Sequence, residues 1–254
     1  MSLQETIRPT VSREDTEVET SVQTCMLSVL VPVYNERDSI LRIIEKVLSV
    51  PMNLEVIVVD DGSSDGTREI LKNWRGDPRV EVLFHDHNRG KGAAIRTGLA
   101  NARGEYVIIQ DADLEYDPDD FPMVIGPLCA GDAQVVYGSR YLSPVPGDRF
   151  RLFRYGVSVL NLVVRVLYGQ RLTDSATCYK AAPTNLLRSL QLECQRFEFC
   201  PEMTSKLCRL KIPILEVPIS YSPRSKAEGK KIGVRDGWEA LVVYWKYRKW
   251  NLNR

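Results

Sequence analysis

The sequence predicts an α/β fold in which helices cover both faces of a mostly parallel sheet. Runs of strand character recur about 26 residues apart, the length of one strand and one helix; they begin near residues 27, 54, 80, 106 and 133. Segments with helical spacing lie between these runs. Acidic or polar clusters follow three of the runs, at 34–36, 60–65 and 111–115. Because ligands bind at the carboxyl edge of such a sheet, we expect the three clusters to form one site.

The first two strands are predicted from apolar runs that end abruptly in polar residues. Residues 27–34 form the first run, and apolar residues at helical spacing follow over 40–48. Residues 54–59 form the second run. A helix is expected over 67–74, after an acidic loop in which two glycines permit tight turns.

The remaining strands of the sheet follow the same alternation. We expect strands over 80–84, 106–110 and 133–137 and helices over 93–102 and 119–128. Residues 106–109 of the fourth strand are a continuous apolar run, which indicates a strand buried on both faces. The apolar stretch 155–167 contains Arg165, so it suits an interfacial or core helix better than a membrane span.

Composition excludes several classes of protein. The chain has 254 residues, enough for one sizeable core. Its 34 basic and 33 acidic residues give no overall attraction to nucleic acid, so no nucleic-acid partner is expected. The six cysteines form no CxxC pair and no metal-ligand spacing with the two histidines, which argues against a structural zinc site.

Three segments are expected along the chain. Residues 1–24 are polar and charged without an apolar core, so they predict a disordered tail and not a signal peptide. Residues 25–235 form the main domain, and 236–254 form a helix rich in aromatic and basic residues. We therefore expect a cytoplasmic protein.

The pair Asp111 and Asp113 predicts a metal site. Both follow the strand at 106–110 and are separated by the small residue Ala112. Carboxylates spaced in this way can converge on one hard divalent cation, Mg²⁺ or Mn²⁺. The alternative is an acidic turn at the end of a strand.

Two common nucleotide-binding signatures are missing. In Asn88-Arg-Gly-Lys-Gly92 a glycine follows the lysine where a P-loop has Ser or Thr, and no GxGxxG motif follows the first strand. Kinase, NTPase and classical dehydrogenase functions are therefore disfavoured.

Six motifs follow one another along the chain: Val31-Pro-Val-Tyr-Asn-Glu36, Val59-Asp-Asp-Gly-Ser-Ser-Asp-Gly-Thr67, Asn88-Arg-Gly-Lys-Gly92, Gln110-Asp-Ala-Asp113, Gly138-Ser-Arg-Tyr141 and Glu216-Val-Pro-Ile-Ser-Tyr221. In this order they resemble family 2 glycosyltransferases of the GT-A fold, close to the polyprenyl-phosphate (dolichol-phosphate) mannosyltransferase branch. The resemblance covers roughly residues 27–235. It implies a GT-A sheet with a C-terminal acceptor-side segment.

The resemblance also implies the residues of the donor site. Those that would hold the nucleoside are Pro32, Tyr34, Glu36, Asp60 and Asp61. Asp111 and Asp113 would hold the metal, with Glu115 as a third ligand. The other residues expected at the donor are Arg89, Lys91, Ala112 and Arg140.

The downstream part of the chain supplies the expected acceptor side. Arg224 and Lys230 lie in a basic, glycine-containing loop that resembles the family's, and such a loop is a good clamp for phosphate. We expect both to act in catalysis together with Asp113. The alternative is a solvated charge run on a connecting loop.

The function expected from the resemblance is metal-dependent, inverting transfer of a hexose from GDP-mannose or UDP-glucose to a polyprenyl phosphate. A phosphate acceptor is already anionic and needs no strong base. Two alternatives stay open: a sugar or glycan hydroxyl acceptor, with Asp174, Glu198 or Glu202 as the base, and a non-catalytic nucleotide-sugar-binding protein. The oligomeric state is left open.

The last helix has two interpretations. Its aromatic and basic side chains would suit a peripheral contact with the headgroups of an anionic membrane. They would equally suit an aromatic face that packs on the domain.

Overall fold

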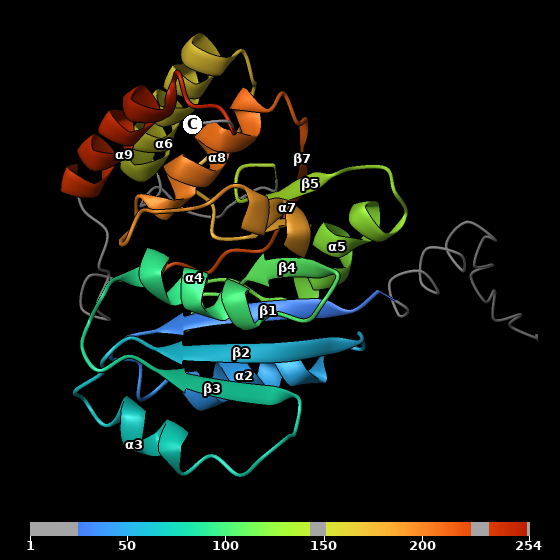
Figure 1. The fold of residues 1–254 in the computed structure, drawn as a ribbon, viewed down its shortest axis with the longest axis vertical. Coiled ribbons are helices and arrows are strands. Elements are labelled where there is room, and N and C mark those ends of the chain that lie inside the picture. Colours follow the sequence, from blue (N-terminus) through green and yellow to red (C-terminus); the bar gives the residue numbers. More distant parts are fainter. Residues whose placement is uncertain (1–24, 143–150, 225–233, 253–254) are drawn as a thin grey trace, which may run out of the picture.

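The computed structural model describes residues 25–142, 151–224 and 234–252. The predicted tail 1–24 and Lys230 lie outside these residues. The described chain forms one seven-stranded sheet in the order β3-β2-β1-β4-β6-β5-β7 (Figure 1). The strands are β1 (Leu27–Val33), β2 (Leu54–Asp60), β3 (Val80–Phe84), β4 (Tyr106–Ile109), β5 (Val135–Ser139), β6 (Lys180–Pro183) and β7 (Ile214–Pro218).

All strand pairs are parallel except those of β6, which is antiparallel to both β4 and β5. The five strands expected from the sequence are confirmed within two residues at each start. Strands β6 and β7 were not predicted. The sequence of β6, Lys-Ala-Ala-Pro, has little strand propensity. Its extended conformation therefore depends on pairing with the neighbouring strands β4 and β5.

The helices are α2 (Ile40–Ser49), α3 (Thr67–Lys72), α4 (Lys91–Asn101), α5 (Phe121–Cys129), α6 (Arg151–Tyr168), α7 (Thr184–Ser189), α8 (Phe199–Arg209) and α9 (Val234–Tyr247), with a short 3₁₀ turn η1 (Pro118–Asp120) before α5. Figure 1 shows α4 in front of the sheet and α2 behind it, as expected for a sheet covered on both faces. In the described part of the chain, no helix combines the length and the apolar character needed to cross a membrane.

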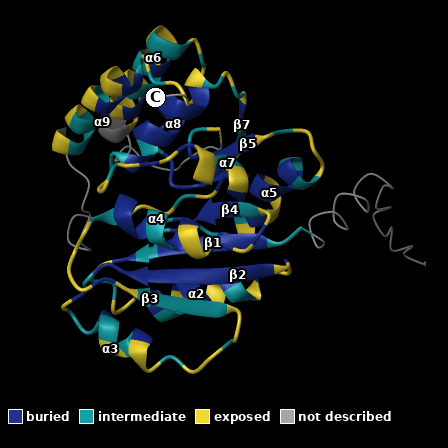
Figure 2. Ribbon diagram, viewed as in Figure 1, coloured by how far each residue is buried: buried dark blue, intermediate teal, exposed yellow. Residues whose placement is uncertain are grey.

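The central strands form the core. Every residue of β2 is buried, and six of the seven residues of β1 are buried (Figure 2). The side chains of Ile40, Ile43, Ile44 and Val47 in α2 are fully buried, which confirms the helical spacing in the sequence. This apolar layer holds the strands in register, with Val33 of β1 paired to Asp60 of β2.

Helices α6, α8 and α9 form a layer beyond β5 and β7 (Figure 1). Tyr244 and Tyr247 of α9 are buried, whereas Trp238 and Trp245 are 68% and 59% exposed. The packing interpretation of this helix is therefore right for its tyrosines but not for these two tryptophans.

Candidate active site

The two aspartates of the Asp-Ala-Asp motif lie directly after β4, at the carboxyl edge of the sheet. Both side chains are half-buried, and Ala112 between them is buried. The Oδ1 atom of Asp111 lies 2.5 Å from Nζ of Lys91, the first residue of α4. The predicted convergence of donor-site residues at this edge is thus present for Asp111, Asp113 and Lys91.

The negative charge of Asp111, Asp113 and Glu115 is only partly neutralised by Lys91. Burial, together with the nearby carboxylates of Asp111 and Glu115, raises the pKa of Asp113 to about 7. Burial alone would lower the pKa of the Lys91 ammonium, but Asp111, Cys178 and Cys200 together outweigh it, and the pKa of Lys91 lies above its ordinary value. Carboxylates that crowd together in this way have the oxygen-only chemistry of a site for a hard divalent cation.

Glu115 makes contacts that bring a distant segment to the site. Its Oε2 accepts a hydrogen bond from the Tyr221 hydroxyl at 2.6 Å, and its Oε1 accepts one from the backbone N–H of Arg224 at 2.9 Å. A third metal ligand at Glu115 stays a prediction. Among the described residues, no group of three or more His, Cys, Asp and Glu side chains is arranged to hold a metal ion.

Arg224 and Glu36 form an ion pair across the site. Nη1 of Arg224 lies 2.9 Å from Oε2 of Glu36, which follows β1. The sequence placed Glu36 at the donor and Arg224 at the acceptor but did not indicate that they touch. Their contact shows that the two expected binding regions adjoin.

The loops after β1 and β2 are tied together by hydrogen bonds. The Asn35 N–H donates to Ser63 Oγ at 3.0 Å, and the Ser64 N–H donates to Asn35 Oδ1 at 2.9 Å. Asn35 has a positive φ of 53°, a conformation that asparagine tolerates better than most residues. Pro32 and Tyr34 lie in or directly after β1, and Tyr34 is exposed.

Asp60 and Asp61 are buried at the end of β2, and both carboxylates bind other residues of the protein. Oδ2 of Asp60 forms an ion pair with Nε of Arg68 at 2.7 Å. The carboxylate of Asp61 accepts from the backbone N–H groups of Arg89 and Gly90 at 2.9 and 2.7 Å and contacts Nδ1 of His85 at 2.7 Å. The sequence did not single out His85. A nucleoside role for the two acids stays a prediction, and their contacts show that they also shape the loop before α4.

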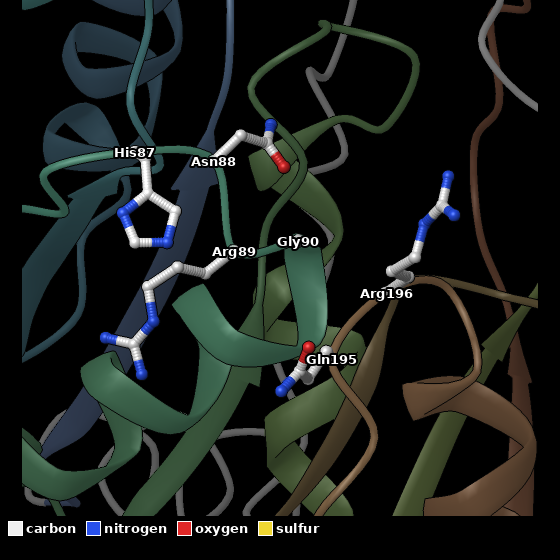
Figure 3. A pocket seen from close by; sticks show the side chains of 6 residues that line it. All are labelled: His87, Asn88, Arg89, Gly90, Gln195 and Arg196. Carbon is white, nitrogen blue, oxygen red and sulfur yellow. The ribbon is translucent and has the colours of Figure 1, made fainter.

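That loop and residues 195–196 line an open pocket of about 410 Å³. It is lined by His87, Asn88, Arg89, Gly90, Gln195 and Arg196 (Figure 3). Gly90 has a φ of +94°, and a Cβ atom there would lie 2.5 Å from the carbonyl oxygen of Gln195. Only glycine permits this close approach, which explains the glycine before Lys91.

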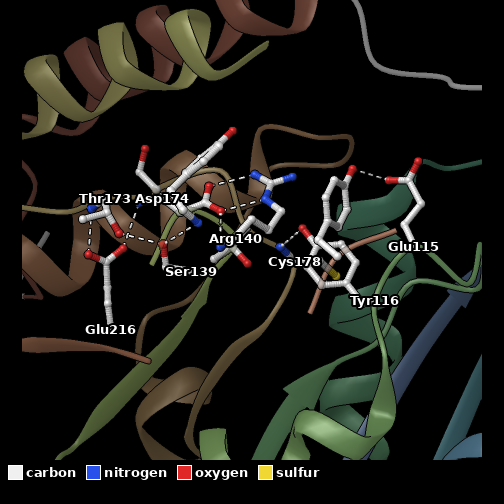
Figure 4. A network of polar contacts seen from close by, with 12 residues as sticks. Glu115, Tyr116, Ser139, Arg140, Thr173, Asp174, Cys178 and Glu216 are labelled. Carbon is white, nitrogen blue, oxygen red and sulfur yellow. Dashed lines mark hydrogen bonds and ion pairs between the residues drawn. The ribbon is translucent and has the colours of Figure 1, made fainter. Parts of the chain in front are cut away.

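Arg140 lies at the end of β5 in a buried network with Asp174 and Glu216 (Figure 4). Its guanidinium binds both oxygens of Asp174 at 2.7 Å, and Glu216 accepts the backbone N–H groups of Thr173 and Asp174. Burial alone would lower the pKa of Arg140, but Tyr116 and Asp174 outweigh it and raise the pKa. The predicted donor contact of Arg140 is untested.

Two of the three acids considered as a base are held in buried ion pairs. Asp174 is fully buried against Arg140. Glu202 is fully buried, lies 2.6 Å from Nζ of Lys206 and accepts the N–H groups of Glu193 and Cys194. These contacts argue against either acid as a general base. Glu198 is half-buried, and its Oε2 accepts the N–H of Arg196 at 3.0 Å.

Comparisons with known proteins identify the family. The model of "Glycosyl transferase family 2" matches residues 28–182. The GT-A fold is supported by glucosyl-3-phosphoglycerate synthase of Mycobacterium tuberculosis, solved with Mn²⁺, UDP and phosphoglyceric acid. It is similar with a TM-score of 0.68 and 21% identity, over 96% of this chain and 85% of that one. A structure of the same enzyme with Mg²⁺ and UDP has a TM-score of 0.65.

Curated relatives share more sequence. An undecaprenyl-phosphate 4-deoxy-4-formamido-L-arabinose transferase of Edwardsiella ictaluri is 29% identical over 80% of this chain, which spans 62% of that protein. A UDP-N-acetylglucosamine–dolichyl-phosphate N-acetylglucosaminyltransferase of Methanococcus voltae is 29% identical over 82% of this chain and 90% of its own length. These names confirm the resemblance to the polyprenyl-phosphate branch.

Proposed function

Because the chain belongs to glycosyl transferase family 2, we propose that it transfers a hexose from a nucleotide-diphosphate sugar to a polyprenyl phosphate. The main support for this proposal is that Asp111, Asp113 and Lys91 lie together at the carboxyl edge of the sheet. The named activities of the curated relatives support the polyprenyl phosphate acceptor. The UDP in one relative's name and in the solved complexes supports a UDP-sugar donor, with a GDP-sugar as the alternative.

The donor diphosphate would bind beside Asp111 and Asp113. These carboxylates would hold Mg²⁺ or Mn²⁺, with further ligands from water or phosphate oxygens. The cation, when bound, would neutralise charge that develops on the leaving diphosphate. Lys91 is already oriented by Asp111 at 2.5 Å, so its ammonium is placed to add positive charge at the same point.

The acceptor phosphate would enter beside Arg224. This residue contacts Glu36 and, through its backbone, Glu115, so it lies against the donor side of the site. Lys230 would assist, although it lies outside the described residues. An anionic phosphate nucleophile needs no strong base, which agrees with the buried, ion-paired state of Asp174 and Glu202.

The reaction is tested by incubating the purified protein with labelled UDP- and GDP-sugars, Mn²⁺ or Mg²⁺, and polyprenyl phosphate. We expect a labelled polyprenyl phosphate sugar. Phosphoglyceric acid and free sugars serve as hydroxyl acceptors in parallel reactions. Transfer only to these would establish the hydroxyl alternative, with Glu198 as the candidate base. Donor binding without any transfer would establish a non-catalytic binder.

A double variant separates donor from acceptor contacts. Lys230→Ala with Lys231→Ala should lower the transfer rate much more than donor affinity, because the donor diphosphate has a metal as counter-charge and the acceptor phosphate does not. Lys72→Ala with Lys211→Ala, both exposed in the structure, is the matched control. Equal losses of rate and donor affinity would assign the two lysines to the donor.

A further inference from the structure

Helix α6 exposes an apolar face. Tyr155, Val159, Leu162 and Val166 are between 52% and 73% exposed and follow one another at intervals of four, three and four residues. This spacing puts them on one side of the helix. The opposite side is also apolar, since Val157 and Val164 are buried against the protein. Packing within the described chain therefore accounts for only one side of α6.

Helix α9 carries a second row of the same kind. Trp238, Val242 and Trp245 are more than half exposed and lie at intervals of four and three residues. The Tyr168 hydroxyl at the end of α6 donates to the carbonyl of Tyr244 in α9 at 2.6 Å, so the helices are joined. Helix α8 packs against both, and Figure 2 shows exposed positions on α6 and α9 at the same end of the molecule. We call these two rows the α6/α9 apolar surface.

The charges beside this surface are mainly positive. Helix α6 contains no acidic residue, and its Arg154 and Arg165 are exposed. Lys246 near the end of α9 and Lys249 just after it are exposed, and Lys246 lies 3.5 Å from Glu193. Helix α9 carries two acids, Asp236 and Glu239, and Glu239 is paired with Arg235 at 2.9 Å. Apolar rows with tryptophan, bordered by cations, match the boundary between headgroups and acyl chains of an anionic membrane.

We infer that the α6/α9 apolar surface docks on an anionic lipid surface. A second copy of the chain fits less well, because a symmetric contact would place the exposed cations of both copies against each other. A lipid surface of opposite charge accommodates both the apolar rows and the cations. Seven large apolar side chains would leave water on docking.

Helix α6 is joined to the buried pair of Arg140 and Asp174. Nδ2 of Asn161 in α6 donates to the carbonyl of Thr173 at 2.6 Å, and Oδ1 accepts the N–H of Ser175 at 2.9 Å. Asp174 between them holds Arg140. If the acceptor is a polyprenyl phosphate, as we propose above, docking would place the site at the level of its phosphate; the docking itself does not depend on that assignment.

Vesicle binding tests the inference without any substrate. The full chain is sedimented with vesicles of phosphatidylcholine alone and of phosphatidylcholine with phosphatidylglycerol. We expect binding to the anionic vesicles that weakens as salt is raised. Leu162→Glu and Trp245→Glu, one change on each helix, should each lower the partition coefficient about tenfold or more. Met123→Glu, on the exposed side of α5, is the matched control and should leave it unchanged.

Three results would overturn the inference. They are no binding of the wild-type protein to anionic vesicles, equal binding by the two variants and the control, and a wild-type dimer in light scattering that Leu162→Glu and Trp245→Glu dissociate. Circular dichroism confirms that each variant is folded. Transfer is measured separately with detergent-solubilised acceptor, where both variants should keep wild-type rates. No transfer in that assay, with vesicle binding intact, would refute the proposed reaction and leave the docking surface standing.

Discussion

Two groups of acids lie near the carboxyl edge of the same sheet, but their charges are balanced in different ways. After β4, Asp111 and Asp113 crowd together with Lys91 as the nearby cation, and the pKa of Asp113 rises to about 7. Before β6, Asp174 is fully buried and accepts hydrogen bonds at 2.7 Å from Nε and Nη2 of Arg140, which follows β5. The first group is short of positive charge, and the second is fully paired.

This difference distinguishes acids that can bind a ligand from acids that support the fold. A crowded, half-buried pair of acids is stabilised when a cation or a proton binds, so it is suited to bind a ligand. A paired, buried acid has no free oxygen to offer, and its loss leaves an uncompensated charge inside the protein. An acid at the edge of the sheet is therefore not by itself a functional residue. Substitutions in the two groups should have opposite signatures.

The largest effect is expected at the paired group. Asp174→Asn keeps the shape of the side chain but leaves the Arg140 guanidinium buried without its counter-charge, so the free energy of unfolding should fall by about 3–5 kcal/mol. Urea unfolding measures it. The control is Glu239→Gln, which breaks the exposed pair with Arg235 and should change stability by less than about 1 kcal/mol. Similar small values for both variants would refute the distinction.

The crowded group should show the reverse pattern. Asp113→Asn removes the charge of one metal ligand, so transfer should fall about a hundredfold or more, equivalent to about 3 kcal/mol. Stability should not fall, because the substitution also removes repulsion from Asp111 and Glu115. Initial rates and urea unfolding of the same preparation give both values. Full activity of the variant, or of the wild type in excess EDTA, would contradict the metal site.

Lys180 extends the comparison to a buried cation. It is fully buried in β6, donates to the Ser175 carbonyl at 2.9 Å and lies 3.5 Å from the centre of the Tyr137 ring. Burial lowers its pKa from 10.5 to about 8. Between these two pH values the unfolded chain keeps a proton that the folded chain has released, so folded stability should rise with pH through this window.

Lys180→Met tests this uncompensated charge. The variant should lack the rise in stability between pH 8 and 10.5, which for wild type is up to about 3 kcal/mol. Unfolding at pH 7, 8, 9 and 10 for both proteins isolates the contribution of this lysine from other groups that titrate there. Parallel pH profiles would show that Lys180 keeps its ordinary pKa in the folded state.

Glu115 adjoins the crowded group and should give the smallest effect. Glu115→Gln keeps one acceptor oxygen for the backbone N–H of Arg224, and its amide NH₂ can donate to the Tyr221 hydroxyl oxygen, so we expect less than about a tenfold loss of transfer and less than about 1 kcal/mol of stability. A loss as large as that of Asp113→Asn would instead assign Glu115 to the metal. The ratio of the two variants' rates at saturating Mn²⁺ decides between these roles.

Local patterns were sufficient for the first half of the fold. Strands β1 to β5 and the helices between them follow from apolar runs and helical spacing, because each pattern spans only five to ten neighbouring residues. The same holds for the position of Asp111 and Asp113, which follows from the end of one apolar run. Strand β6 escaped prediction because its four residues carry no such pattern, and its neighbours β4 and β5 impose the extended conformation.

The amino-acid sequence alone thus determined the family motifs, the five leading strands and the chemistry of the Asp-Ala-Asp pair. Only the tertiary structure decided which acids are paired. Asp174 meets Arg140 across 34 residues, and Glu115 meets Arg224 across 109 residues. It also decided which sides of α6 and α9 are covered. Propensity and periodicity describe neighbours along the chain, whereas the charge balance and burial of a side chain depend on segments that the folded sheet brings beside it.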